Sequence, residues 1–211
     1  MTGRTHRRRV DSPPTPVSRP NWVVCGLAIA GMAVSGYLTW LKLTGAGAAF
    51  CVAGSGCDIV QASRYALLLG VPTALWGFAV YVVIGVLGAA GLGHRNWLIA
   101  FLFAAGGVGF SIYLTGLSIF DVGATCIWCL TSAVILALTL ATLLSRRPPP
   151  QGRRSALGPS RLATYAILAA GGTALAGAFV FAAPFSAPPG YQSALARHLT
   201  ETKAVMYGAF W

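Results

Sequence analysis

Long apolar runs with almost no charge inside them dominate this chain of 211 residues. Hydrophobic residues make up 56% of the sequence and charged residues only 9%, whereas about a quarter of a soluble domain is charged. Five runs, at residues 22–43, 71–92, 97–120, 126–144 and 162–185, each have the length expected of a membrane-spanning helix. We therefore predict an all-α integral membrane protein.

The formal net charge of +11 is concentrated in the polar segments between these runs. Arginines gather before the first run, at Arg95, and between residues 146 and 161. If the spans alternate in direction, these segments share one side of the membrane, which the positive-inside rule makes the cytoplasmic side. The other side holds only Lys42, Arg64, Arg197 and Lys203, together with Asp58, Asp121 and Glu201. This placement predicts a cytoplasmic N-terminus and argues against a nucleic-acid-binding arm.

The predicted organisation follows from the spans and the segments between them. In order, it comprises a disordered basic cytoplasmic tail (1–20), four spans within 21–145, a basic cytoplasmic loop (146–161), a fifth span (162–185) and an outer linker (186–211). Within the outer loop 44–70, the stretch DIVQASRYALLLG has helical apolar spacing, which predicts a short helix along the membrane surface. Pro72 is expected in the first turn of its span, where proline costs no hydrogen bond. Residues 93–96 and 121–125 are expected to be tight turns.

Four of the five cysteines fall on the predicted outer side. Cys51 and Cys57 lie in the loop 44–70, and Cys126 and Cys129 open the span 126–144 at its outer end. Disulfides persist outside the cytoplasm, so two pairs on this face can relay electrons by thiol–disulfide exchange. Cys25 lies near the cytoplasmic end of the first span without a partner, and we expect it to be a small packing residue.

Each outer pair has a sequence context that suits this chemistry. Cys126 and Cys129 are spaced i and i+3 at a helix N-terminus, where unpaired N–H groups and the helix dipole stabilise a thiolate. The five small residues VAGSG between Cys51 and Cys57 would let that loop close a labile disulfide.

Other interpretations of the four cysteines remain open at this point. They could form purely structural disulfides, or they could bind zinc. A non-enzymatic metal carrier or scaffold would use them as soft ligands. Redox chemistry is favoured because one pair begins a membrane helix beside Trp128, and because the five spans contain no His, Asp or Glu that would mark an ion pathway.

Three motifs together resemble the vitamin K epoxide reductase family, specifically its bacterial homologues, over about residues 22–145. They are Cys51-x5-Cys57-Asp-x4-Ser63, the stretch GVPTALWGF at residues 70–78, and Cys126-Ile-Trp-Cys129. The resemblance implies a four-helix transmembrane bundle at 21–145 around a quinone pocket near the outer face. It also implies a fifth, peripheral transmembrane helix that leads to a thioredoxin-like domain in fused members.

The resemblance also implies roles for individual residues. Cys51 and Cys57 would be a shuttle pair that a partner thiol reduces, and Cys57 would then exchange with Cys126. Cys129 would face the quinone and deliver electrons to it. Ser63 matches a loop serine that helps through a hydrogen bond, although a helix cap or a solvent-facing hydroxyl explains a serine equally well.

Residues of the quinone pocket follow in the same way. The implied lining consists of Trp76, Thr73, Leu114, Val122 and Trp128, although an aromatic such as Trp76 on a membrane helix is more often simple packing. Thr73 stands where the animal enzymes have an asparagine that binds the quinone oxygen, and Ala133 stands where they have a tyrosine. Both departures favour plain quinone reduction over vitamin K epoxide chemistry.

We therefore expect a quinone-dependent thiol–disulfide oxidoreductase that generates disulfides in exported proteins. It would sit in the bacterial inner (plasma) membrane and use a quinone of the ubiquinone or menaquinone class, without a metal and without nucleic acid. Its electron donor would be a thioredoxin-like protein or fused domain. The tail at 194–211 resembles the lead-in to such a domain and stops at Trp211 before any CxxC. The chain as given is therefore expected to lack its own fused donor.

Overall fold

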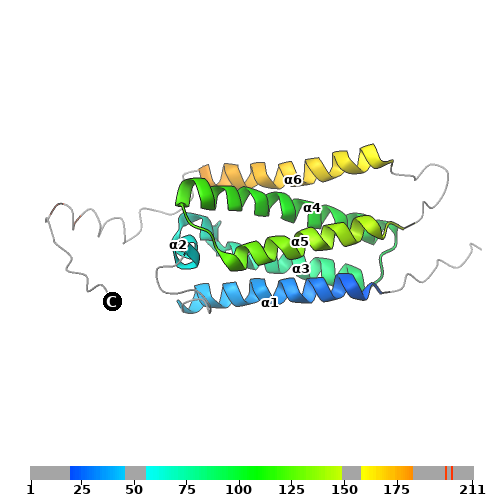
Figure 1. The fold of residues 1–211 in the computed structure, drawn as a ribbon, viewed down its shortest axis with the longest axis horizontal. Coiled ribbons are helices and arrows are strands. Elements are labelled where there is room, and N and C mark those ends of the chain that lie inside the picture. Colours follow the sequence, from blue (N-terminus) through cyan, green and yellow to red (C-terminus); the bar gives the residue numbers. More distant parts are fainter. Residues whose placement is uncertain (1–19, 46–55, 149–157, 183–197, 199–200, 202–211) are drawn as a thin grey trace, which may run out of the picture.

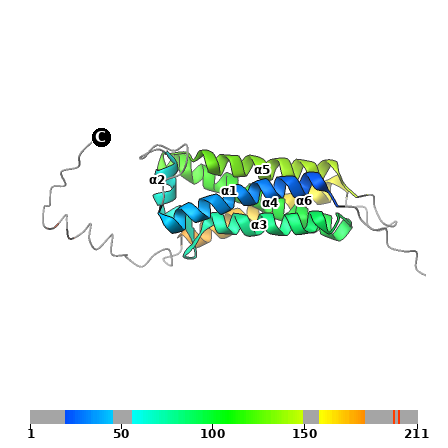
Figure 2. The ribbon, with the colours of Figure 1, turned by 90° about the horizontal axis from the view of Figure 1, so that it is seen from below.

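Five long helices run side by side along the molecule, and a short helix lies across one end of them (Figures 1 and 2). This computed structural model describes residues 20–45, 56–148 and 158–182, together with His198 and Glu201. The helices are α1 (Trp22–Thr44), α2 (Gly56–Ala62), α3 (Thr73–Ala89), α4 (His94–Leu117), α5 (Ile127–Ser145) and α6 (Pro159–Ala182). A 3-10 helix (Arg64–Ala66), strands β1 (Leu67–Leu68) and β2 (Val71–Pro72), and a π-helix (Ser118–Val122) complete the described elements.

Four of these helical segments are long and apolar enough to cross a membrane. They are Trp22–Thr44, His94–Val122, Ile127–Ser145 and Pro159–Ala182. The predicted all-α membrane architecture is therefore confirmed. The helix at the predicted second span, α3, has 17 residues, or about 26 Å at 1.5 Å per residue, which is the lower limit for spanning.

Helices α1 and α3 are antiparallel. They pack closely because a glycine of one helix faces a side chain of the other. The backbone N–H of Asn21, before α1, donates to the carbonyl oxygen of Gly88 near the end of α3 at 3.0 Å. Gly31 faces the fully buried ring of Tyr81, and a Cβ at Gly31 would lie 2.1 Å from that ring. Small residues commonly permit such close helix contacts in membranes.

One buried cluster joins all five long helices. Its members include Val24 and Ala28 of α1, Tyr81 and Ile84 of α3, Trp97 and Phe101 of α4, Leu136 and Leu143 of α5, and Leu162 of α6. Polar groups inside it are paired: Tyr81 donates its hydroxyl to the Ser132 carbonyl at 2.8 Å, and Trp97 donates its indole N–H to the Leu143 carbonyl at 2.8 Å.

The fifth long helix, α6, lies outside a ring formed by α1, α3, α4 and α5. Within the ring, α1 contacts α3 and α5, and α4 contacts the same two helices, whereas α6 packs mainly on α4 (Figure 1). The contact is tight, since a Cβ at Gly109 would lie 2.5 Å from the Cα of Ala170. Thr173 of α6 also donates its hydroxyl to the Gly106 carbonyl at 2.8 Å. This is the predicted bundle of four helices with a peripheral fifth.

Several predicted boundaries are wrong. The sequence predicts Pro72 in the first turn of a helix beginning at Val71, but α3 begins at Thr73. The preceding residues form a two-residue antiparallel hairpin, with Leu69 at φ 56° and Gly70 at φ 79° in its turn. Because strand pairing holds residues 71 and 72 extended, the helix starts only after them.

The expected turn at 93–96 is helical from His94 onward, and the expected turn at 121–125 is helical in its first two residues. Helix α4 starts at His94, directly after Gly93, and the chain continues from α4 into the π-helix, which contains Asp121. The turn is shortened to the residues after Val122, where Gly123 adopts φ 70°. Helix α6 begins at Pro159, three residues before the predicted start at 162, and residues 183–185 of the predicted span lie outside the described part.

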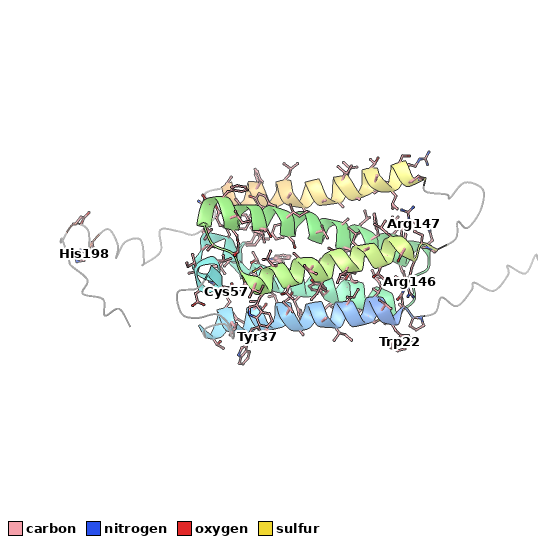
Figure 3. All side chains as sticks on the ribbon, in the orientation of Figure 1. Trp22, Tyr37, Cys57, Arg146, Arg147 and His198 are labelled. Carbon is pink, nitrogen blue, oxygen red and sulfur yellow. The ribbon has the colours of Figure 1, made fainter. Side chains whose placement is uncertain are left out.

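The cysteine-bearing loop and the arginine-rich ends lie at opposite ends of the bundle. Cys57 lies at the end crossed by α2, whereas Arg146, Arg147 and Trp22 lie at the other (Figure 3). The predicted separation of the outer cysteines from the basic segments thus holds for these residues. Which end faces the cytoplasm stays a prediction.

Candidate functional site: two cysteine-bearing segments at one end of the bundle

Helix α2 brings the residue before Cys57 against the residue before Cys126. Cys57 is buried and disulfide-bonded; Cys51, its predicted partner, lies outside the described residues. The preceding residue, Gly56, packs against the backbone of Thr125, and a Cβ at Gly56 would lie 2.4 Å from the Thr125 carbonyl oxygen. Only glycine permits this approach, and it brings the segment with Cys57 next to the segment with Cys126.

Cys126 is the N-cap residue of α5, so the helix begins one residue after the predicted start of the span at 126. Its Sγ accepts a hydrogen bond from the backbone N–H of Cys129 at 3.4 Å. The Cys126 side chain is buried, at 2% exposure, whereas Cys129 is exposed, and both are free thiols. The two cysteines of the motif therefore differ in access to solvent: Cys126 is enclosed and Cys129 is open.

The surroundings of Cys126 stabilise its thiolate. A hydrogen bond from the Cys129 thiol is the largest influence and, with the backbone N–H groups of Cys129 and Trp128, outweighs burial to lower the Cys126 pKa to about 7. Near neutral pH, a substantial fraction of Cys126 is therefore the thiolate, which is the nucleophilic form. The indole of the intervening Trp128 packs against Tyr37 of α1, with ring centroids 5.1 Å apart.

Two polar contacts lie at the C-terminal end of α2, one to α1 and one within the loop. Lys42, in the last turn of α1, donates to the Gln61 carbonyl at the end of α2 at 2.5 Å. Ser63 donates its hydroxyl to the Val60 carbonyl at 2.7 Å, so it caps α2. This is the helix-cap alternative for Ser63; its predicted part in the redox chemistry stays a prediction.

A second polar link joins the loop to the end of α4. Tyr65, in the 3-10 helix, donates its hydroxyl to Asp121 Oδ2 of the π-helix at 2.5 Å, and Arg64 donates to the Tyr65 oxygen. Arg64 also forms an ion pair with Asp121 at 3.5 Å. Sequence reasoning missed this link, because nothing in the spacing pairs residues 56 positions apart.

Comparison of the sequence with known proteins shows the family of this chain. The sequence model of the Vitamin K epoxide reductase family matches residues 22–144, which include α1 to α5 and both cysteine-bearing segments. The chain belongs to the vitamin K epoxide reductase family. It is also 31% identical, over 203 residues, to the thiol-disulfide oxidoreductase LTO1 of Arabidopsis thaliana. That match covers 83% of this chain and 52% of the relative, so the chain spans about half the relative's length.

The predicted quinone-lining residues of this vitamin K epoxide reductase family member come from four elements. Thr73 is the first residue of α3, and Trp76 follows one turn later with 45% of its surface exposed. Leu114 lies near the end of α4, Val122 ends the π-helix, and Trp128 lies in the first turn of α5. Thr73 already donates its hydroxyl to the Ala66 carbonyl at 3.2 Å. A quinone pocket bounded by these residues stays a prediction.

Two further observations concern the alternatives raised by the sequence. Among the described residues, no group of three or more His, Cys, Asp or Glu side chains could hold a metal ion. Cys25 is half-buried between α1 and α3, with its sulfur 4.0 Å from the Gly85 carbonyl, as expected of a packing residue.

Proposed function

We propose that this protein is a membrane thiol oxidase. It takes electrons from a thioredoxin-like protein through two cysteine pairs and reduces a membrane quinone, which generates disulfides in exported proteins. The contact of Gly56 with Thr125 carries the proposal, because it brings the segments of Cys57 and Cys126 together. Family membership and the thiol–disulfide oxidoreductase named in the comparison support the same chemistry.

The first half of the relay oxidises the donor. A thiolate of the donor attacks the Cys51–Cys57 disulfide, and the second donor thiol resolves the mixed disulfide. The donor leaves as a disulfide, and Cys51 and Cys57 become thiols. Two electrons and two protons have then moved from the donor to the shuttle pair.

The second half passes those electrons to the CxxC pair. The Cys57 thiolate attacks the Cys126 sulfur of a Cys126–Cys129 disulfide, and Cys129 leaves as a thiolate. Cys51 then attacks Cys57, which restores the shuttle disulfide and releases Cys126. A leaving thiol with a lowered pKa departs faster, and the pKa of Cys126 is lowered to about 7.

The residues at the start of α5 fit a quinone as the electron acceptor. Cys129 is exposed while Cys126 is buried, so a lipid-soluble molecule can reach the Cys129 sulfur from an apolar helix surface that includes Ile127 and Leu130, both exposed. A bound quinone would supply an acceptor for two electrons and two protons. We propose Trp76, Thr73, Leu114, Val122 and Trp128 as the residues that would hold its ring.

The proposed location is the bacterial inner membrane, with the N-terminus in the cytoplasm and the cysteines outside. The positive-inside rule supports this orientation, because Arg146 and Arg147 lie at the end opposite Cys57 (Figure 3). An oxidising compartment on the cysteine side is what a thiol oxidase needs.

Quinone addition to the purified, fully reduced protein tests this function. We expect the oxidised quinone absorbance to bleach while free thiols disappear, two for each quinone, since the couple transfers two electrons. The Cys25→Ala variant serves as the matched control and should behave like the parent. Thiols that persist beside unbleached quinone would contradict the proposal and favour a soft-metal carrier or scaffold.

A further inference from the structure

The hydroxyl of Tyr65 bridges the two segments that carry the exchanging cysteines. Tyr65 follows Cys57 on the loop side, and Asp121 precedes Cys126 on the other side. The Tyr65 hydroxyl donates to Asp121 Oδ2 at 2.5 Å, and the guanidinium of Arg64 lies over the Tyr65 ring, 4.8 Å from its centroid. The link is therefore a second contact between these segments, separate from the contact of Gly56 with Thr125.

On the loop side, Cys57 and Tyr65 belong to one continuous hydrogen-bonded piece. Helix α2 runs to Ala62, and the backbone N–H of Ser63 donates to the Val60 carbonyl at 3.2 Å. The 3-10 helix follows at once, with the Ala66 N–H bound to the Ser63 carbonyl at 3.1 Å. A displacement of Tyr65 would therefore move Cys57 with it.

On the facing side, Asp121 and Cys126 share a short, folded stretch. Asp121 lies in the π-helix, and the N–H of Ala124 returns to the Ser118 carbonyl at 3.0 Å. Cys126 then begins α5. π-helical turns are often found at functional sites, and this one follows α4 and ends at Val122, four residues before the buried Cys126.

The hydrogen bond from the Tyr65 hydroxyl to Asp121, and not the ion pair of Arg64 with Asp121, gives the link between the two segments its specificity. The side chains of Arg64 and Asp121 are 65% and 53% exposed, and exposed ion pairs contribute little. The Tyr65 ring is buried and meets Phe181 of α6 edge-on, with centroids 5.3 Å apart. The ring is therefore held in place, and a hydrogen bond to a charged oxygen is stronger than a neutral one.

We propose that Tyr65 is a positioning residue that, through Asp121, holds Cys57 in register with Cys126 for interloop disulfide exchange. The inference rests on the proposed function, since it concerns one step of that relay. Lys42 fixes the end of α2 to α1, and Gly56 fixes its start to Thr125. Without the Tyr65 hydroxyl, the exposed ion pair of Arg64 with Asp121 is the described polar link that is left between the piece from Gly56 to Ala66 and the segment that carries Cys126.

The alignment of Cys57 with Cys126 can be measured in the whole chain, from the equilibrium between the Cys57–Cys126 disulfide and glutathione. In a background with Cys25→Ala, Cys51→Ala and Cys129→Ala, the remaining thiols can form only the Cys57–Cys126 disulfide. Oxidised glutathione accepts the two electrons and leaves as two reduced molecules. A second background with Cys25→Ala, Cys51→Ala and Cys57→Ala reports the local Cys126–Cys129 disulfide in the same way.

We expect Tyr65→Phe to lower the Cys57–Cys126 equilibrium constant on the order of tenfold, because a hydrogen bond to a charged group is lost. The Cys126–Cys129 constant should stay within about twofold. Asp121→Leu should have the same effect as Tyr65→Phe, and the double variant should be no worse than either one, since both remove one shared bond. Asp121→Asn, which keeps an accepting oxygen, should recover most of the parent value.

Tyr113→Phe is the matched control, because Tyr113 pairs with Phe110 on α4, and it should change neither constant. An unchanged Cys57–Cys126 constant in both Tyr65→Phe and Asp121→Leu would overturn the positioning role and leave the relay standing. Equal losses in both disulfides would show a merely structural role and overturn it as well. No Cys57–Cys126 disulfide in the parent background would instead contradict the relay itself.

Discussion

The backbone of Gly56 lies against the carbonyl oxygen of Thr125, at a distance that leaves no space for a side chain. This contact joins a loop helix to the N-terminus of α5 one residue before each exchanging cysteine. It explains how a loop that crosses the end of the bundle can bring Cys57 to a buried Cys126. The site is therefore built from a backbone contact as much as from the cysteines.

Gly56→Ala tests that contact. A Cβ would lie 2.4 Å from the Thr125 oxygen. Because that oxygen belongs to the backbone and a Cβ has no freedom to rotate away, α2 must move. We expect donor-driven quinone reduction to fall by roughly tenfold or more, since small misplacements of reacting groups are costly. Gly171→Ala is the matched control, as a Cβ there meets nothing within 4 Å. Equal activity of the two variants would show that the approach is not needed.

Gly31→Ala tests the packing of α1 on α3. The new methyl would lie 2.1 Å from the Tyr81 ring, and Tyr81 is fully buried and hydrogen-bonded to Ser132. Overpacking of this kind costs about 1–3 kcal/mol, so thermal unfolding in detergent should shift to a clearly lower temperature. Gly172→Ala, on an open surface of α6, should leave the transition in place. A stable Gly31→Ala protein would mean that the two helices can separate at little cost.

The lowered pKa of Cys126 predicts a pH dependence. Because its pKa is about 7 and the Cys129 thiol is the largest cause, thiolate ultraviolet absorbance of the reduced protein should titrate with a midpoint near that value. The thiolate is lost as the pH falls through the midpoint, so attack of the reduced Cys126 on the Cys51–Cys57 disulfide should slow in acid. Cys129→Ala should move the midpoint upward, toward an ordinary thiol. An unchanged midpoint in Cys129→Ala would show that the backbone N–H groups alone lower the pKa of Cys126.

Topology labelling tests the orientation. A membrane-impermeant maleimide should reach reduced Cys51 in intact cells, because the cysteine end is predicted to lie outside. A thiol placed by Ser145→Cys, at the exposed end of α5 beside Arg146, should react only after permeabilisation. The reverse pattern would overturn both the orientation and the oxidising compartment.

The elements that sequence reasoning predicted well are those with local causes. Apolar runs are sufficient for the long helices, and because Cys126 and Cys129 open such a run, their position at a helix N-terminus was predicted. The hairpin before α3 was missed because it places Leu69 at a positive φ, which its residue type disfavours. The bond of Tyr65 to Asp121 was missed because tertiary packing, not sequence spacing, brings these residues together.

The trapped disulfide of the Cys129→Ala protein tests the central claim most directly. Without Cys129, the Cys126 thiolate should attack the Cys51–Cys57 disulfide at Cys57 and release Cys51. Only a return attack by Cys51 can undo this step, so alkylating the released Cys51 thiol before digestion should preserve the Cys57–Cys126 disulfide. Mass spectrometry after non-reducing digestion should find the Cys57–Cys126 peptide pair, and quinone reduction should be abolished. The Cys25→Ala protein should show neither change. Only a Cys51–Cys57 pair, or undiminished quinone reduction without Cys129, would contradict the relay.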